Sequence, residues 1–265
     1  MKTTIRAALT LAMSAATLAG PVAAAEEAGL RAGAAVVDVS PTTLPAIVNG
    51  GFLQAVADQV RDPLHARCIV LEKGMTRLAI VVVDSCMMPR ELIDDAKARA
   101  SKATGIPVDR MLVSATHTHT AASSMGALGT PVDPAYAAFL PGKIAEAIEK
   151  AAAAVVPAEA GWAAVDDPEH THSRRWIRRP DRIIDDPFGA KTVRANMHPG
   201  HVDPDVIAPS GPSDPALTVL ALREPGGRPI AVLANYSMHY FGSSPVSADY
   251  YGRFADALAR KIAPE

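Results

Sequence analysis

The sequence predicts an α/β fold with mixed sheets, flanking helices and one long irregular loop region. Several runs of four to nine residues are almost entirely apolar and rich in Val, Ile and Leu, which is typical of strands covered on both faces. Longer segments with helical periodicity lie between some of these runs. The composition suits a packed domain, because 49% of the 265 residues are hydrophobic and 20% are charged.

In chain order, the first half alternates strands and helices. Apolar, β-branched residues predict strands at 34–39, 67–72, 78–84 and 111–115, and helical periodicity predicts helices at 91–103 and 135–155. Segment 78–115 therefore consists of strand, helix and strand. If its two strands are parallel neighbours, we expect a right-handed crossover between them.

The second half has a different pattern. Further strands are predicted at 159–165, 217–223 and 229–235, and a last helix at 248–262. Between them, segment 166–215 is polar, rich in Pro, Arg and His, and has little periodicity. Irregular segments of this length in compact domains are usually functional or disordered, so we expect a long irregular loop there.

Residues 1–25 have the features of a secretory signal peptide. Lys2 and Arg6 give a positive start, an apolar run follows at 7–19, and Ala23 to Ala25 form a small-residue cleavage site. We therefore divide the chain into a signal peptide, 1–25, and one domain, 26–265, and expect a secreted or periplasmic protein. The apolar run is too short to span a bilayer, so we expect no transmembrane segment after signal removal.

Charge and cysteine content exclude two classes of function. The formal net charge is −2, so no basic field is present to hold a nucleic acid. Only two cysteines, Cys68 and Cys86, occur, which excludes a CxxC-type metal cluster. An oxidising compartment allows a disulfide between them, and two buried free thiols are the alternative.

The histidines predict a site at strand ends. His117 and His119 directly follow the run 111–115, and His239 follows the run 229–235. Open α/β sheets place ligands at such carboxyl ends. Residues two apart in an extended chain face the same side, about 7 Å apart. Imidazole is a favoured zinc ligand, so these histidines are candidates for one zinc site, and strand-end hydrogen bonding is the alternative.

The other histidines have different local contexts. His170 and His172 lie in the polar segment, where a substrate-facing rim or a solvated loop is favoured and a second metal site is the alternative. His198 and His201 are separated by Pro and Gly, which indicates a turn, and they are interpreted as structural or rim residues. His65 is interpreted as a partly buried structural side chain.

A set of motifs resembles the neutral/alkaline, non-lysosomal ceramidases. Segment 114–120, Ser-Ala-Thr-His-Thr-His-Thr, is similar to a histidine motif of that family. Other similar segments follow the family's order, at 34–41, 48–52, 62–67, 173–176, 211–215, 235–239 and 247–250. The resemblance covers residues 31 to 260.

The resemblance implies a zinc-dependent amidohydrolase that cleaves the N-acyl amide of ceramide-like lipids into a sphingoid base and a fatty acid. It implies that His117 and His239 bind zinc. His119 and Arg174 would face the amide and hydroxyl region of the substrate, with Arg175 as the alternative to Arg174. Gly50 or Gly51 would line the pocket by close backbone approach.

A carboxylate often orients a metal-bound imidazole through its other nitrogen. Asp38, Asp84 and Asp249 are candidates for this role, and their alternative is strand-end or helix-cap bonding. A small-molecule lipid amide is the expected partner, and the oligomeric state is not predicted.

The sequence also departs from the family pattern. Members carry a further Glu and Tyr ligand well downstream of the second histidine, and no counterpart occurs before Glu265; Ser173 replaces an Asn of the arginine motif. The resemblance therefore implies an N-terminal catalytic part, with weak or no amidase activity of residues 26–265 alone. The alternatives are a non-catalytic secreted module that binds lipid or metal, and a metallohydrolase of another amide or ester.

Overall fold

The computed structural model describes residues 29–200, 202–239 and 245–262; the predicted signal peptide lies outside them. A five-stranded sheet with the order β7-β6-β5-β1-β8 forms the centre. Its strands are β1 (Arg31–Asp38), β5 (His65–Lys73), β6 (Thr76–Val83), β7 (Met111–Ala115) and β8 (Val156–Pro157). The β1, β5 and β6 pairings are antiparallel, whereas β6 and β7 are parallel neighbours, so the predicted mixed sheet is confirmed.

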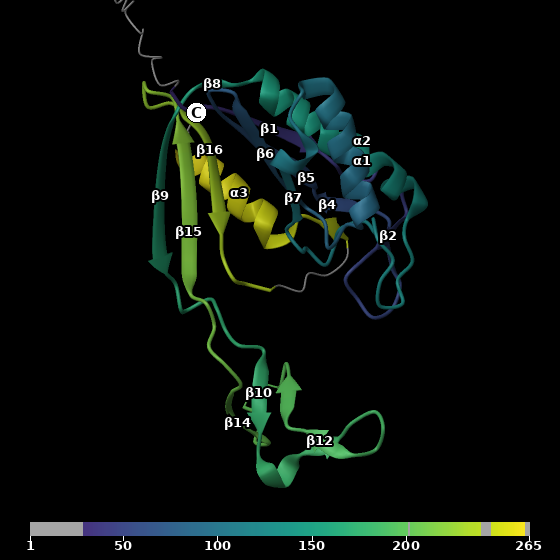
Figure 1. The fold of residues 1–265 in the computed structure, drawn as a ribbon. Coiled ribbons are helices and arrows are strands. Elements are labelled where there is room, and N and C mark those ends of the chain that lie inside the picture. The colour runs from purple at the N-terminus through teal and green to yellow at the C-terminus, as the bar shows by residue number, and fades with distance from the viewer. Residues whose placement is uncertain (1–28, 201, 240–244, 263–265) are drawn as a thin grey trace, which may run out of the picture.

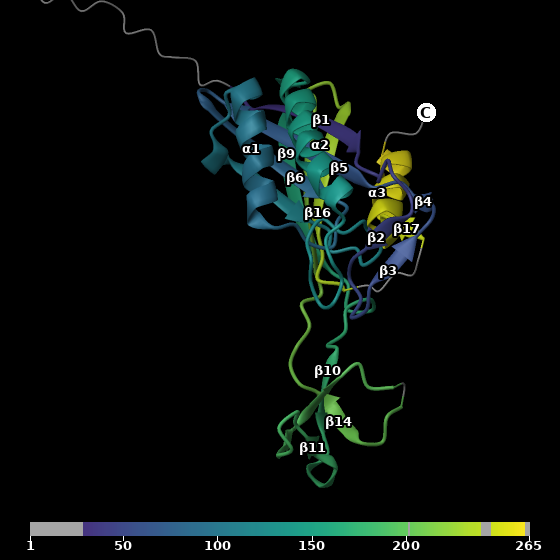
Figure 2. The same ribbon diagram turned by 90° about the vertical axis from the view of Figure 1, so that its right-hand side faces the viewer.

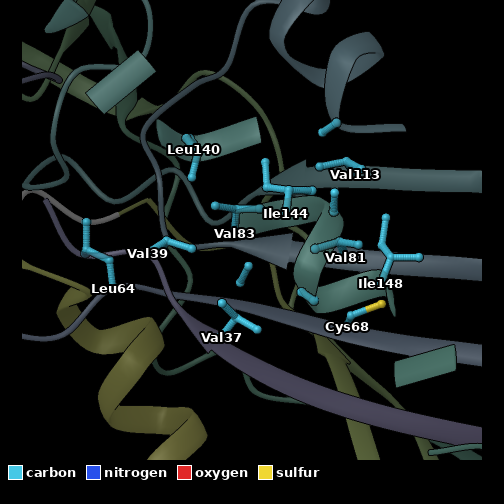
Figure 3. Packing of buried hydrophobic residues seen from close by; sticks show 14 of the residues in the cluster. Val37, Val39, Leu64, Cys68, Val81, Val83, Val113, Leu140, Ile144 and Ile148 are labelled. Atoms are coloured by element: carbon cyan, nitrogen blue, oxygen red, sulfur yellow. The ribbon is translucent and has the colours of Figure 1, made fainter. Parts of the chain in front are cut away.

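Two helices cover one face of this sheet (Figures 1 and 2). They are α1 (Arg90–Thr104), which connects β6 to β7, and α2 (Pro134–Ala153). Leu140, Ile144 and Ile148 recur every four residues on α2 and are fully buried. Figure 3 shows them against the valines of the sheet, among them Val81 and Val83. This spacing places one apolar stripe of the helix against the sheet. The same periodicity in the sequence therefore predicted the helix correctly.

A second sheet, with the order β16-β15-β9, lies on the opposite face (Figure 1). Its strands are β9 (Glu159–Asp166), β15 (Ala216–Arg223) and β16 (Pro229–Asn235). A smaller apolar cluster joins the two sheets and contains Ala32, Ile69, Ala158 and Leu222. The central strands therefore have apolar contacts on both faces, which explains their nearly continuous apolar sequences.

Residues 167–215, called the insertion, leave the domain after β9 and return at β15, and they project from it (Figures 1 and 2). In its described part, the expected irregular segment contains five short strands and one 3₁₀ turn, Pro180–Arg182. The strands are β10 (Arg175–Arg178), β11 (Ile184–Asp185), β12 (Lys191–Val193), β13 (Ala195–Met197) and β14 (Val206–Pro209). Polar contacts such as the Arg178–Asp205 ion pair hold them, so no apolar alternation predicted them.

Further short strands lie near the edge of the sheet where β6 and β7 end, namely β2 (Ala46–Val48), β3 (Ala55–Ala57), β4 (Val60–Asp62) and β17 (Val246–Ser247), and β17 is followed by α3 (Asp249–Ile262). A 3₁₀ turn (Val108–Arg110) precedes β7 at the opposite edge. β17 pairs in parallel with β4 and so joins the end of the chain to its beginning. No helix in the described ranges combines the length and apolarity needed to cross a membrane.

Both cysteines are buried free thiols, so the free-thiol alternative is confirmed. Burial raises the pKa of Cys68 to about 12 and that of Cys86 to about 11. At pH 8 roughly one in a thousand Cys86 thiols is therefore ionised, against roughly one in four for an ordinary cysteine.

We expect the native protein to react with a thiol reagent such as DTNB at pH 8 far more slowly than the urea-unfolded chain. In the native protein the two thiols are almost entirely protonated, and they are buried away from the reagent. Absorbance at the reagent's product band measures this. Rapid labelling of either thiol in the native protein, under conditions where circular dichroism shows it folded, would contradict this prediction.

Candidate metal centre

Three histidine rings meet at the edge where β6, β7 and β16 end. The ring centroids of His117 and His119 are 4.7 Å apart, those of His119 and His239 4.8 Å, and those of His117 and His239 5.2 Å. His117 is exposed, and the other two are half-buried. The fold therefore brings His239, far away in the sequence, to the His117-Thr118-His119 tripeptide.

The local chain explains why both histidines of the tripeptide face outward. Thr118 and Thr120 are buried, and their hydroxyls donate to the same carbonyl, that of Ser247, at 3.1 and 2.8 Å. Because these threonines point inward at alternate positions, His119 between them points to the open side. His117 faces the same side through a left-handed backbone turn and not through regular extended alternation.

His117 is held in a defined orientation. Its backbone φ of 69° is a strained value for a residue that is not glycine. Its N–H donates to the carbonyl of Ser85 at 2.9 Å, and its ring Nδ1 lies 2.8 Å from the carbonyl oxygen of Cys86. A carbonyl only accepts, so Nδ1 carries the proton and Nε2 presents its lone pair toward the site.

The donor set fits a zinc ion. The Nε2 atoms of His117 and His119 are 3.1 Å apart. Two nitrogens on one tetrahedral zinc, each at about 2.0–2.1 Å, are roughly 3.3 Å apart. The His119 ring is therefore close enough to be a further ligand, besides the substrate-facing role implied by the resemblance.

Electrostatics keep two of the rings neutral. Burial, together with the neighbouring His117, lowers the pKa of His119. Burial is the main cause that lowers the pKa of His239 to about 4, and the charges of His119 and Arg174 lower it further. A metal ligand must be the neutral imidazole, so at pH 7 the proton competes little with a metal at His239.

Cys86 is a site residue that sequence reasoning missed. Its Sγ forms, with one ring nitrogen each of His117 and His119, a group of ligand atoms within 4.8 Å of one another. Burial raises the pKa of this thiol to about 11, so in the metal-free protein it is protonated, and its carbonyl rather than its sulfur orients His117. The sequence could have pointed to Cys86 through its position just after β6, because β6 and β7 are parallel neighbours whose ends meet at the same edge.

Of the two candidate arginines, the structure places Arg174 at the site. Arg174 lines a cavity together with His239, and its charge contributes to the lowered pKa values of His119 and His239. Arg175 belongs to β10, lies opposite Met197, and is not among the described residues that line this cavity.

Of the two candidate glycines, Gly50 makes the close approach. A Cβ at Gly50 would lie 2.8 Å from the Cα, Cβ and Cγ atoms of His119, and its φ is 113°. Gly51 has no such contact, since the nearest atom to a Cβ there is the Leu53 carbonyl oxygen at 3.4 Å.

We expect Gly50→Ala to displace His119 and weaken zinc binding at least about 10-fold, because ring support of this kind is usually worth that much. Its strained φ should also destabilise the fold by about 1–3 kcal/mol. Gly74→Ala is the matched control, because Gly74 has a φ of 57° but no atom within 4 Å of its Cβ position. Thermal unfolding should detect a loss in both variants, and zinc titration only in Gly50→Ala; wild-type zinc affinity in Gly50→Ala would refute the supporting role.

The three candidate carboxylates make other contacts in the structure, and His117 has a different partner. Asp84 accepts from Arg67 Nη1 at 2.7 Å and from the N–H of His65 at 2.9 Å, whereas the partner of His117 Nδ1 is the Cys86 carbonyl. Asp38 accepts the N–H of Ser40 at 2.7 Å. Asp249 begins α3 and accepts the N–H of Tyr250 at 2.7 Å. For these three residues the alternative of strand-end and helix-end bonding holds, because their backbones leave nearby N–H groups to be satisfied.

The other histidines do not form a second metal centre in the described part of the chain. His170 Nδ1 lies 3.0 Å from both carboxylate oxygens of Asp167, and its side chain is 63% exposed. His170, His172 and His198 all line the cavity beside His239, which agrees with the rim interpretation. His65 contacts Arg67 through its Nδ1 at 3.3 Å.

These features define a mixed α/β domain with a histidine-lined site at its strand ends. A scan against protein-family models and a search of curated protein sequences found no match. Solved structures do match. A neutral ceramidase from Pseudomonas aeruginosa aligns with a TM-score of 0.66 and 16% identity, over 91% of this chain and 37% of that one.

A ceramidase complexed with C2 aligns with a TM-score of 0.64 and 17% identity, over 90% of this chain and 36% of that one. The domain therefore has a neutral-ceramidase-like fold, which confirms the family resemblance at the level of the fold. The chain spans a little over a third of the length of these ceramidases.

Proposed function

We propose that this protein is a zinc-dependent hydrolase of linear N-acyl amides, with ceramide-like lipids as its substrate class, and that it acts in the periplasm or outside the cell. The observation that carries this proposal is the convergence of His117, His119 and His239 at one edge of the sheets. The fold likeness to neutral ceramidases and the ordered motifs of the sequence support the substrate class.

In this proposal His117 and His239 hold the metal, and the Cys86 carbonyl keeps the His117 ring in place. Zinc, when bound, acts as a Lewis acid toward the scissile carbonyl and activates a water for attack at neutral pH. Arg174 lines the cavity beside His239, and the ring of His119 contacts the ring of His239. The N–H groups of Arg174 and His119 would donate to the carbonyl oxygen as negative charge develops on it.

The test is release of free amine from N-octanoylsphingosine by the protein expressed from its complete gene, with zinc and with EDTA. We expect zinc-dependent turnover that His117→Ala abolishes and that Arg174→Gln lowers about 100-fold or more, as removal of an oxyanion donor usually does. Stoichiometric binding of the lipid without product would instead establish a non-catalytic module. Turnover of small polar amides in preference to the lipid would establish a hydrolase of another substrate class.

A further inference from the structure

Three large apolar side chains protrude beside the candidate metal centre. Phe52 and Leu53, in the loop between β2 and β3, are 77% and 83% exposed, and Leu128 is 56% exposed. These three side chains are called the apolar tips. The loop after β2 lies at the end of the domain from which the insertion projects (Figures 1 and 2).

Close contacts connect the apolar tips to the histidine motif. The loop that carries Phe52 begins at Gly50, where a Cβ would lie 2.8 Å from atoms of His119. Gly129 packs against the same loop, since a Cβ there would lie 2.8 Å from the carbonyl oxygen of Phe52. Leu128 directly precedes Gly129. The tips therefore form one surface that adjoins the site.

The leucine at position 128 is not required by the turn that it occupies. Ala127 and Thr130 exchange two backbone hydrogen bonds, at 3.0 and 2.9 Å, around the two-residue turn Leu128-Gly129. Both residues of the turn have a positive φ, 54° and 87°. Such turns favour Asn-Gly, and a leucine with positive φ is strained. Since this leucine is also exposed, neither the turn nor the core accounts for it.

The segments that form the site and the apolar tips carry no charge. Segments 39–57 and 111–132 contain no Asp, Glu, Lys or Arg, although 20% of the whole chain is charged. The segment that carries His239, 229–248, contains none either. An uncharged apolar surface can enter the hydrocarbon boundary of a bilayer without the cost of desolvating charged groups.

From this uncharged surface beside the histidine cluster, we propose that Phe52, Leu53 and Leu128 dock the protein on a phospholipid bilayer by inserting their side chains, and not by attraction to anionic head groups. The proposal rests on the proposed function, because a lipid amide would then reach the site directly from the bilayer. A second copy of the chain fits less well, since a two-fold interface needs a self-complementary patch and these side chains stand on protruding turns.

The test is co-sedimentation of the protein expressed from its complete gene with phosphatidylcholine vesicles. We expect the wild type to bind. Sodium chloride at 1 M should not weaken the binding, because salt screens charges and not apolar contacts. Addition of phosphatidylserine to the vesicles should strengthen binding less than about 3-fold, because the segments around the tips supply no basic side chain to the head groups.

Variants of the tips keep the test independent of folding. The double variant Phe52→Ser, Leu53→Ser should weaken vesicle binding at least about 10-fold, since full burial of one such side chain is worth about that much. Met75→Ser is the matched control, because Met75 is 100% exposed in the turn between β5 and β6, at the other end of β6 from the histidines. Leu128→Asn should weaken binding about 5-fold without lowering the unfolding temperature, because asparagine favours this turn.

Two substrates separate docking from catalysis. For N-octanoylsphingosine embedded in phosphatidylcholine vesicles, turnover by the Phe52→Ser, Leu53→Ser variant should fall in parallel with vesicle binding, about 10-fold or more. For N-acetylsphingosine dissolved below its critical micelle concentration, kcat/KM of the same variant should stay within about 2-fold of wild type, because no bilayer has to be engaged.

Absence of vesicle binding by the wild type would overturn the proposal, and light scattering would show whether a second copy covers the tips instead. Binding that requires phosphatidylserine and is lost in salt would overturn insertion. Tip variants that bind vesicles and hydrolyse embedded lipid like wild type would also overturn the proposal, while leaving the hydrolase function intact. Conversely, tip-dependent vesicle binding without hydrolysis of either substrate would support the docking surface and reject the hydrolase proposal.

Discussion

Replacing His117 or His239 by alanine is expected to weaken zinc binding by well over 100-fold. Loss of an outer partner of a metal ligand costs about 10–100-fold in affinity, and loss of the ligand itself removes a metal bond as well. The two residues come from different strand ends, and their ring centroids are 5.2 Å apart. Competition with a chromophoric zinc chelator at pH 7 measures the affinity.

Two further variants make this experiment decisive. His170→Ala removes an exposed histidine that pairs with Asp167 outside the cluster, and it should leave zinc affinity unchanged. His119→Ala should weaken zinc binding by about 10- to 100-fold and abolish turnover, because its ring lies beside the metal ligands and is assigned to the substrate. A loss equal to that of His117→Ala would make His119 a third ligand. Unchanged zinc affinity in both His117→Ala and His239→Ala would reject the metal centre altogether.

The second large effect is expected for the ion pair beneath the site. Asp84 is fully buried, and Arg67 Nη1 lies 2.7 Å from its Oδ2. Burial raises the pKa of Asp84, and the charge of Arg67 is the largest opposing effect. Arg67→Met would leave a buried carboxylate without its counter-ion, which typically destabilises a protein by about 3 kcal/mol or more at neutral pH.

The carboxyl group of Asp84 also determines how the stability of Arg67→Met changes with pH. In Arg67→Met the folded-state pKa of Asp84 rises further above its unfolded value, so the folded variant binds more protons than the unfolded one. The variant should therefore regain stability relative to wild type as the pH falls through that raised pKa. Urea unfolding at pH 7 and at pH 5.5 measures both effects.

Arg99→Met is the matched control, because Arg99 pairs with Asp95 on the exposed side of α1 at 2.8 Å, and such pairs contribute about 0.5 kcal/mol or less. The double variant Arg67→Met, Asp84→Asn has no ionisable group at this place and should lose the extra pH dependence. Equal, pH-independent losses in Arg67→Met and Arg99→Met would show that Asp84 does not need its buried partner.

This ion pair also affects the metal centre. Asp84 begins the segment whose next two carbonyls, those of Ser85 and Cys86, accept the backbone N–H and the ring Nδ1 of His117. Arg67→Met should therefore also weaken zinc binding, by an amount typical of an outer-shell change. The sequence marked Asp84 as a candidate for orienting an imidazole, but the route through the two carbonyls depends on β5, β6 and β7 lying side by side.

Local pattern determined the regular elements of this protein. The strand 111–115 and helices such as α2 were predicted within one or two residues, because their apolar residues repeat with the period of the element. The same reasoning placed His117, His119 and His239 at strand ends. The short strands of the insertion were missed, because turns and ion pairs hold them rather than an alternating apolar face.

The α/β class, the candidate histidines and the resemblance to neutral ceramidases thus follow from local patterns along the chain. The packing of distant elements was needed to bring the three histidines together. It also placed Arg174 and Gly50, not Arg175 and Gly51, at the site, and made the Cys86 carbonyl the partner of His117. Periodicity predicts which way a side chain faces within its own element, whereas these contacts join atoms from elements that are far apart in the chain and meet only when the sheets pack.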